Sequence, residues 1–236
     1  MGFFIFNGES SVDYGVQIEK YPVRPYPERI YDSYTVPGRS GDLVYDTKAY
    51  KNVVQSYECY FKNPGASSYE MERYLTAWLL QPKGYQVLED SYDPEVFRKA
   101  IYAGPVEVSS FFGKYGRCTL EFNCQPQRWL KNGQYPMAAE DGMQLWNEGE
   151  PALPLIQVAG SGAGVLSIGS SIIELQEIPD GLTIDVESQN IYAGLKNRNE
   201  IATITGGFPE LPRGQTGISF SGGITAVSIT PRWWIL

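Results

Sequence analysis

Residues suited to a buried face alternate with polar residues through most of the first half of the chain, and this alternation predicts β-strands. Two segments show the clearest period of two, which is typical of a strand with one buried face. Their inward positions are Val53, Gln55, Tyr57, Cys59 and Phe61 in the first segment and Cys118, Leu120, Phe122 and Cys124 in the second. A shorter alternation over Val12, Tyr14, Val16 and Ile18 predicts another strand.

One segment, at about residues 68–80, has the spacing of an amphipathic helix. Its apolar stripe is Met71, Tyr74, Leu75, Trp78 and Leu79. Ser67 and Glu70 fit a capping box, and Pro82 and Gly84 end the pattern. We expect this helix to pack on a sheet face; the alternative is that the stripe binds a partner.

The second part of the chain shows only strand-like patterns. Short apolar runs lie near 153–158, 164–168, 171–178, 182–186, 200–205, 218–220 and 224–230. Pro179-Asp180-Gly181 predicts a hairpin turn, and the turn-rich segment 131–151 predicts a linker. The fold class is therefore mainly β: an N-terminal β-fold with one α-helix over residues 1–145, and a C-terminal β-sandwich over residues 146–236.

Residues 21–41 are rich in proline and tyrosine. Pro22, Pro25, Pro27 and Pro37 exclude a helix or a central strand, so an extended loop or arm is expected. Its tyrosines are Tyr21, Tyr26, Tyr31 and Tyr34. A long ordered loop indicates a contact role; a loop folded over its own domain is the alternative.

Composition removes several classes of function. The 236 residues include no histidine, which excludes Ser-His-Asp and Cys-His catalysis and His-ligated zinc. The formal net charge of -8 disfavours specific nucleic-acid binding and anionic membrane surfaces. The N-terminus lacks the features of a signal peptide, and no apolar stretch has the length of a membrane span.

The three cysteines predict buried free thiols rather than a disulfide framework or a metal site. Cys118 and Cys124 lie on one face of one strand, about 20 Å apart if that strand is continuous, which is too far for a bridge. Reduced cysteines favour synthesis and assembly in a cytoplasm. No cofactor is expected.

Three segments contain residues that could form a binding or catalytic site, but a purely structural role explains each of them better. The glycine-rich segment from Gly160 to Gly164 lacks the helix that a phosphate loop needs, so a glycine hairpin or bulge is expected. The acidic residues Glu89, Asp90, Asp93 and Glu95 read as a solvated turn. Trp233 and Trp234 fit core or interface packing better than sugar stacking. We therefore expect no enzyme.

Several short motifs follow one another in a distinctive order along the chain. They include Phe6-Asn7-Gly8, Tyr14-Gly15-Val16, Val36-Pro37-Gly38-Arg39-Ser40-Gly41, the segment from Pro154 to Gly162, Gly207-Phe208-Pro209 and Pro231-Arg232-Trp233-Trp234. In this order they resemble the distal tail protein (Dit) family of siphophages and related prophages. The resemblance covers almost the whole chain, and the Pro-Gly-Arg-x-Gly and Pro-Arg-Trp-Trp motifs are its more specific parts.

The resemblance implies a structural virion component made and assembled in the host cytoplasm and placed at the distal end of the tail. It implies a hexameric ring that joins the tail tube protein to the tail-associated tip protein and is often the hub for receptor-binding or baseplate proteins. It also implies a galectin-like C-terminal sandwich and a last strand, near 229–236, that returns to the N-terminal domain. Trp233 and Trp234 would then anchor the two domains.

A ring needs two different surface patches on each subunit. The tyrosine-rich arm fits one patch, so the candidate interface residues are Tyr26, Tyr31, Tyr34 and Arg39, with Arg39 pairing across the subunit boundary or, alternatively, within its own chain. Two other functions stay open. One is a monomeric carbohydrate-binding sandwich using Trp146, Trp233 or Trp234; the other is a glycosidase using Glu89, Asp90 or Asp93.

Overall fold

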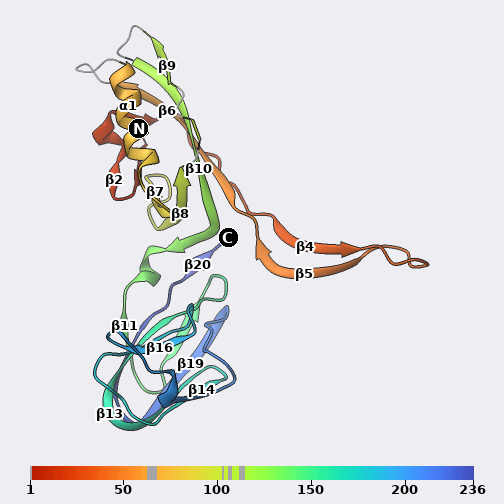
Figure 1. Ribbon diagram of the computed structural model, residues 1–236, viewed down its shortest axis with the longest axis vertical. Helices are drawn as coiled ribbons and strands as arrows, with labels where there is room; N and C mark the ends of the chain where they lie inside the picture. The colour runs from red at the N-terminus through yellow and green to blue at the C-terminus, as the bar shows by residue number, and fades with distance from the viewer. Residues whose placement is uncertain (1, 63–67, 103, 106–107, 112–114) are drawn as a thin grey trace. The chain divides into compact units, whose positions relative to one another are not determined.

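The structure, a computed structural model, describes residues 2–62, 68–102, 104–105, 108–111 and 115–236, and it is mainly β (Figure 1). The chain divides into two compact units, residues 1–128 with Leu236 and residues 129–235. The division at Arg128 lies ahead of residue 145, where the sequence places the boundary.

The first unit contains one large sheet and a separate two-stranded ribbon. The sheet order is β2-β1-β7-β8-β10-β6-β3, and β9 also pairs with β10. The bounds are β1 Phe4–Phe6, β2 Glu9–Ser10, β3 Val16–Ile18, β6 Val53–Lys62, β7 Gln86–Asp90, β8 Val96–Tyr102, β9 Val108–Phe111 and β10 Tyr115–Leu130. The last strand, β20 Trp234–Ile235, lies among the residues of the second unit. The ribbon pairs β4, Arg29–Tyr34, with β5, Leu43–Tyr50.

The expected strands at 53–61 and 118–124 are confirmed as β6 and β10. They pair in antiparallel register from Tyr115 opposite Lys62 to Cys124 opposite Val53. Because opposite residues share a face, the inward positions of the two strands form one buried surface. These side chains and those of β1 form the core of the first unit.

The expected helix is confirmed as α1, Ser68–Leu80, which is the α-helix of the described residues. Leu75, Trp78 and Leu79 are buried, whereas Tyr74 is exposed. The Trp78 indole N–H donates to the Phe6 carbonyl at 3.2 Å, so the helix covers the β1 side of the core. The capping box involves Ser67, which lies outside the described residues.

The strand expected over 12–18 is shorter than its alternation indicates. Ser11–Tyr14 is a turn of 3₁₀ helix, η1, and only Val16–Ile18 is a strand. The Ser10 hydroxyl accepts the Val12 N–H at 3.3 Å, and Gly15 takes the left-handed conformation at φ 71° that ends the turn. Local capping therefore overrides a pattern of only four alternating residues.

The second unit is a β-sandwich in which the described strands form one hydrogen-bonded sheet. Its path is β11-β19-β13-β15-β16-β17, with β12 beside β19, β14 beside β13, and β18 beside β14. The bounds are η2 Lys131–Gln134, β11 Met137–Ala139, β12 Gln144–Asn147, β13 Leu155–Ile168, β14 Ser171–Leu175, β15 Leu182–Asp185, β16 Asn190–Ala193, β17 Lys196–Asn197, η3 Asn199–Ile201, β18 Ala202–Thr205 and β19 Gly214–Thr230.

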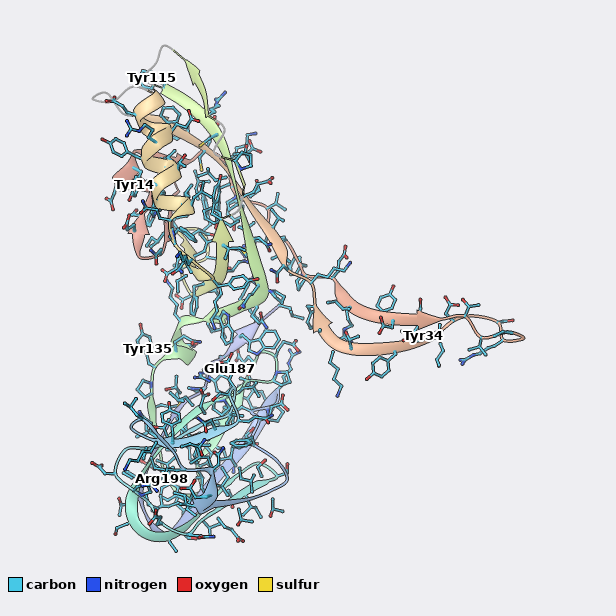
Figure 2. All side chains as sticks on the ribbon, in the orientation of Figure 1. Tyr14, Tyr34, Tyr115, Tyr135, Glu187 and Arg198 are labelled. Atoms are coloured by element: carbon cyan, nitrogen blue, oxygen red, sulfur yellow. The ribbon has the colours of Figure 1, made fainter. Side chains whose placement is uncertain are left out.

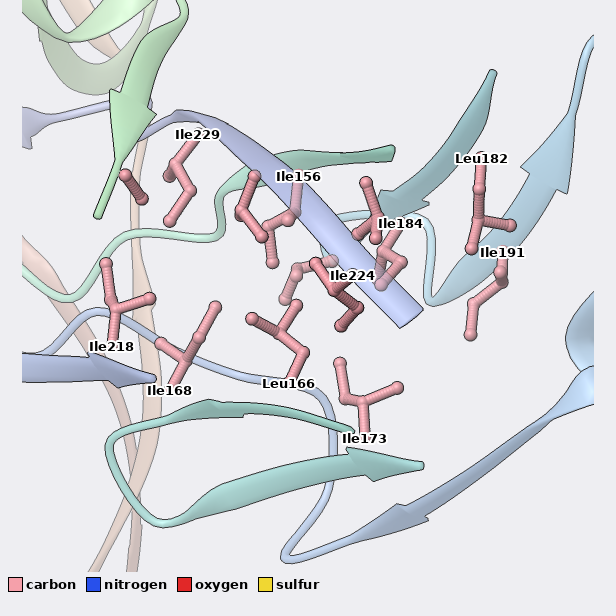
Figure 3. Packing of buried hydrophobic residues seen from close by; sticks show 14 of the residues in the cluster. Ile156, Leu166, Ile168, Ile173, Leu182, Ile184, Ile191, Ile218, Ile224 and Ile229 are labelled. Atoms are coloured by element: carbon pink, nitrogen blue, oxygen red, sulfur yellow. The ribbon is translucent and has the colours of Figure 1, made fainter. Parts of the chain in front are cut away.

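The two layers arise because the long strands β13 and β19 take part in both. The first part of β13 pairs with β15 and its last part pairs with β14, while β19 stays beside it throughout. The register shifts between Ala159 and Gly164, which confirms the expected bulge in the glycine segment. Isoleucine and leucine side chains from both layers meet between them (Figure 3).

Two sequence expectations fail in this unit. The segment 131–151 is no linker, because β11 and β12 lie within it and both pair with β19. Its turn signals join strands of the sandwich, and Gly142 has the positive φ, 81°, of such a turn. Pro179-Asp180-Gly181 makes no hairpin, because the strands it joins, β14 and β15, pair with β13 rather than with each other.

Gly223 gives the first testable prediction. A Cβ at this position would lie 1.8 Å from the Ser161 carbonyl oxygen, a backbone atom that cannot move without opening the bulge. Gly223→Ala should destabilise the second unit by about 2–3 kcal/mol through overpacking. Urea unfolding would measure this change in the free energy of unfolding.

Gly217→Ala, on the same strand, is the matched control. Its added Cβ would meet only the flexible Gln144 side chain, at 3.1 Å. We expect a much smaller loss of stability for this variant. Equal losses for the two variants would contradict the close backbone approach at the bulge.

Candidate interaction surface

Five large, exposed apolar side chains of the first unit lie on the ribbon formed by β4 and β5: Tyr31, Tyr34, Leu43, Val44 and Tyr45. Antiparallel pairing sets Tyr34 opposite Leu43, Ser33 opposite Val44, and Asp32 opposite Tyr45. Because opposite residues share a face, one face carries Tyr34, Leu43 and Tyr45. Tyr34 and Tyr45 are 57% and 63% exposed on this face, and Tyr31 and Val44 are each 60% exposed on the other, so neither face of the ribbon is covered by its own chain. Figure 2 shows Tyr34 standing out from the ribbon.

The tip of the ribbon is a tight turn that the sequence specifies. The Arg39 N–H donates to the Val36 carbonyl at 3.1 Å, and Gly38 has φ 82°. Proline at the second position and glycine at the third are the requirements of a type II turn, and Pro37 and Gly38 supply them. The Thr35 hydroxyl donates to Asp42 at 2.9 Å across the loop, so the tip is held in one shape.

An irregularity near the base sets the twist of the ribbon. Tyr31 lies opposite Asp46, but Ile30 lies opposite Ala49, so β5 carries two extra residues. Lys48, one of them, has φ 59°, and its N–H donates to the Asp46 carboxylate at 2.9 Å. The Thr47 hydroxyl donates to the Ile30 carbonyl at 2.5 Å. Such bulges increase local twist and bend the bulged strand.

Charges are paired at the base of the ribbon and unpaired at its tip. The Arg29 guanidinium lies 2.9 Å from Asp46, and Lys51 lies 2.9 Å from Glu28. Arg39 is exposed and forms no ion pair with any residue that the structure describes. The expected alternative of a pair within the chain is therefore not seen there, and its pairing across a subunit boundary stays a prediction.

The four residues predicted for the interface lie in three different places. Tyr31 and Tyr34 stand on opposite faces of the ribbon, because they are an odd number of positions apart, three, along β4. Arg39 is at the tip. Tyr26 precedes the ribbon, with its ring 5.8 Å from the Arg128 guanidinium. The expected loop is thus partly an exposed strand, which proline at 22, 25, 27 and 37 permits because all four lie outside residues 29–34.

Sequence reasoning missed the second strand of the surface. Leu43, Val44 and Tyr45 are all exposed, and Leu43 directly opposes the predicted Tyr34. The signal was present: an apolar run next to a Pro-Gly turn with a similar run before it predicts a hairpin. The prolines on either side of residues 29–34 led to the prediction of one long loop, so this hairpin was not predicted.

The fold of the whole chain matches a known structure, although its sequence matches no family model and no curated protein. The crystal structure of the Dit protein (gp 19.1) of SPP1 aligns over 100% of both chains with a TM-score of 0.76 and 14% sequence identity. The chain has the Dit fold. That protein is described as a paradigm of the hub adsorption apparatus in phages that infect Gram-positive bacteria. The family resemblance of the motifs is confirmed at the level of the fold.

The C-terminal tryptophans of this Dit fold both make contacts inside the second unit. Trp233 is buried in the core of the sandwich, and its carbonyl accepts the Leu130 N–H at 2.9 Å. The Trp234 indole donates to the Pro151 carbonyl at 2.9 Å. Sugar stacking needs an exposed ring, so the carbohydrate-binding alternative depends on Trp146, which is 64% exposed. An inter-domain anchor at Trp233 and Trp234 stays a proposal.

The acidic turn at residues 89–95 is structural rather than freely solvated. One oxygen of Asp90 accepts two backbone N–H groups of the following turn, and the other accepts the Tyr57 hydroxyl at 2.9 Å. Burial, together with the Asp90 charge, raises the pKa of Tyr57 well above its usual value. Asp93 lies 3.7 Å from both Arg24 and Arg128. The carboxylates of Asp90 and Asp93 thus stabilise this turn. They are two of the three groups that the glycosidase alternative assigns to catalysis.

No cluster of three or more metal-ligating side chains occurs among the residues that the structure describes. In the same part of the chain, no helix has the length and apolar character needed to cross a membrane.

Proposed function

We propose that this protein is a distal tail protein that forms a ring-shaped hub in a phage tail. The observation that carries the proposal is the Dit fold over the full length of both chains. Six copies would form the ring, and the ring would join the tail tube protein to the tail-associated tip protein. Receptor-binding or baseplate proteins would attach to this hub.

The β4–β5 ribbon supports the proposal, because it has an exposed surface of the kind that ring closure requires. A closed ring uses a heterologous interface, in which each subunit presents one patch and receives another. The ribbon has exposed tyrosine and aliphatic side chains on both faces, and tyrosine contributes large contact area at low entropic cost. A ribbon exposed in one subunit would be covered by the next.

Light scattering of the purified protein, with negative-stain images of the same sample, tests the proposal. We expect the mass of six chains and particles with six-fold symmetry. A protein that stays monomeric at high concentration, and still does so when mixed with the tail tube and tip proteins of its own phage, would contradict it. Glycan binding lost on Trp146→Ala would instead support the carbohydrate-binding alternative.

A further inference from the structure

Two of the three cysteines, Cys59 and Cys118, lie directly opposite each other at the centre of the first unit. The antiparallel register of β6 and β10 pairs them, although 58 residues separate them in the chain. Both thiols are free and buried, and they lie close enough to shift each other's pKa. The third thiol, Cys124, is buried further along β10, and its own opposite residue is Val53.

The backbone hydrogen bonds show which type of pair this is. The Glu19 N–H donates to the Glu58 carbonyl at 2.8 Å, so Glu58 directs its polar backbone groups toward β3. Successive residues direct these groups to opposite sides, so Cys59 directs its own toward β10. Cys59 and Cys118 are therefore a hydrogen-bonded pair, whose Cα atoms are about 5.5 Å apart. Disulfides most often have Cα spacings of about 5.5–6 Å.

A cavity of about 430 Å³ adjoins this pair, and its lining includes both cysteines together with Tyr102, Thr119 and Arg117. The two residues are 1% and 5% exposed, so a reagent reaches their thiols only when this part of the sheet opens transiently. The neighbouring Cys118 thiol and burial raise the pKa of the Cys59 thiol. Cys118 is the less buried of the two, at 5% exposed against 1% for Cys59, so it is the thiol that a reagent meets first. The thiolate is the reactive form in such an exchange.

We propose that Cys59 and Cys118 are a modification site that forms a cross-strand disulfide with a low-molecular-weight disulfide such as oxidised glutathione. The Cys118 thiolate attacks one sulfur of the reagent, forms a mixed disulfide and releases one thiol. Cys59 loses its proton to water, attacks the Cys118 sulfur and releases the second thiol. The two protein thiols lose two electrons together, and one reagent disulfide is reduced to two thiols.

The product would link the two longest strands of the sheet in the first unit. Directly opposite Cβ atoms in a sheet are about 4.5–5.5 Å apart, wider than the roughly 3.8 Å of a relaxed disulfide. The bond would therefore be strained and readily reduced, which is typical of reversible disulfides rather than permanent ones. The protein would hold free thiols in a reducing cytoplasm and the disulfide in an oxidising medium. This inference does not rest on the proposed function.

Thiol counting of the intact, folded protein tests the proposal. The wild-type protein is incubated with oxidised glutathione, then denatured, alkylated with iodoacetamide and weighed by mass spectrometry. We expect the number of alkylated thiols to fall from three to one, with no glutathione retained and with Cys124 as the remaining thiol by peptide mapping. Reduction with dithiothreitol should restore all three.

Cys124→Ser is the matched control, since Cys124 is buried on the same face of the same strand. Its alkylated thiols should fall from two to none. Cys59→Ser should stop at a mixed disulfide on Cys118 and keep one glutathione. Three alkylated thiols in the oxidised wild-type protein, a bridge that includes Cys124, or glutathione adducts without a bridge would each overturn the proposal.

Discussion

Serine at both Tyr34 and Leu43 should abolish self-association of the protein while leaving both units folded. The two side chains are opposite each other on one face of the β4–β5 ribbon, and both are exposed. Exposed positions contribute little to folding, about 0.5 kcal/mol or less each. Buried at an interface, an aromatic anchor contributes about 2 kcal/mol or more, so loss of two anchors weakens each contact at least 100-fold.

Light scattering at a series of concentrations would measure this loss. Tyr135→Ser, at an equally exposed tyrosine of the second unit, is the control and should assemble as the wild type does. A second double variant, Tyr31→Ser with Val44→Ser, tests the other face of the ribbon, since Tyr31 and Val44 share it. Wild-type masses for both double variants would show that the ribbon does not hold subunits together.

Phe122→Ala should cost the first unit about 3–5 kcal/mol of its free energy of unfolding. Phe122 is fully buried on β10, and the rings of Phe4, Phe6, Tyr57 and Tyr102 surround it with centroids 5.1–5.9 Å away. Removal of the Phe122 ring leaves a cavity, because the four surrounding rings are closely packed and cannot move in to fill it. Since whole domains are stable by about 5–15 kcal/mol, the first unit would be close to unfolding at room temperature.

Amide hydrogen exchange would separate the effect on the two units. Protection should fall in β6 and β10 and remain in β13 and β19, because Phe122 contributes only to the core of the first unit. Tyr115→Ala, at an exposed position on the same strand, is the matched control and should change stability by less than about 0.5 kcal/mol. A loss below about 1 kcal/mol for Phe122→Ala would contradict the central role of this ring.

The strands and the helix with the longest patterns were predictable because their patterns are local. β6 and β10 alternate over seven or more residues, and α1 has a full apolar stripe followed by Pro82 and Gly84. The four-residue alternation from Val12 to Ile18 was too short to exclude a capped turn. The turn residues between 131 and 151 were correctly found, but turns inside a sandwich and turns in a linker have the same composition.

Part of the candidate surface was also predictable. Tyr31, Tyr34 and Arg39 could be selected because proline excluded a buried strand and tyrosine indicated contact. Their grouping could not be, because the face that each residue occupies depends on the register with β5. The opposing residues Leu43 and Tyr45 become part of the surface only through that pairing.

By itself, the sequence determined the mainly β class, the helix at 68–80, the two-part layout and the resemblance to the Dit fold, because periodicity, turn residues and motif order are properties of the chain. Three features depend on the tertiary structure. The strands β13 and β19 belong to both layers of the sandwich through the bulge between them. Residues 29–50 form an exposed ribbon, and Cys59 lies opposite Cys118. Each of these depends on which distant segments pair and in what register. A shift of one residue in the register of a strand would turn each of its side chains to the other face, and the local sequence pattern does not specify that register.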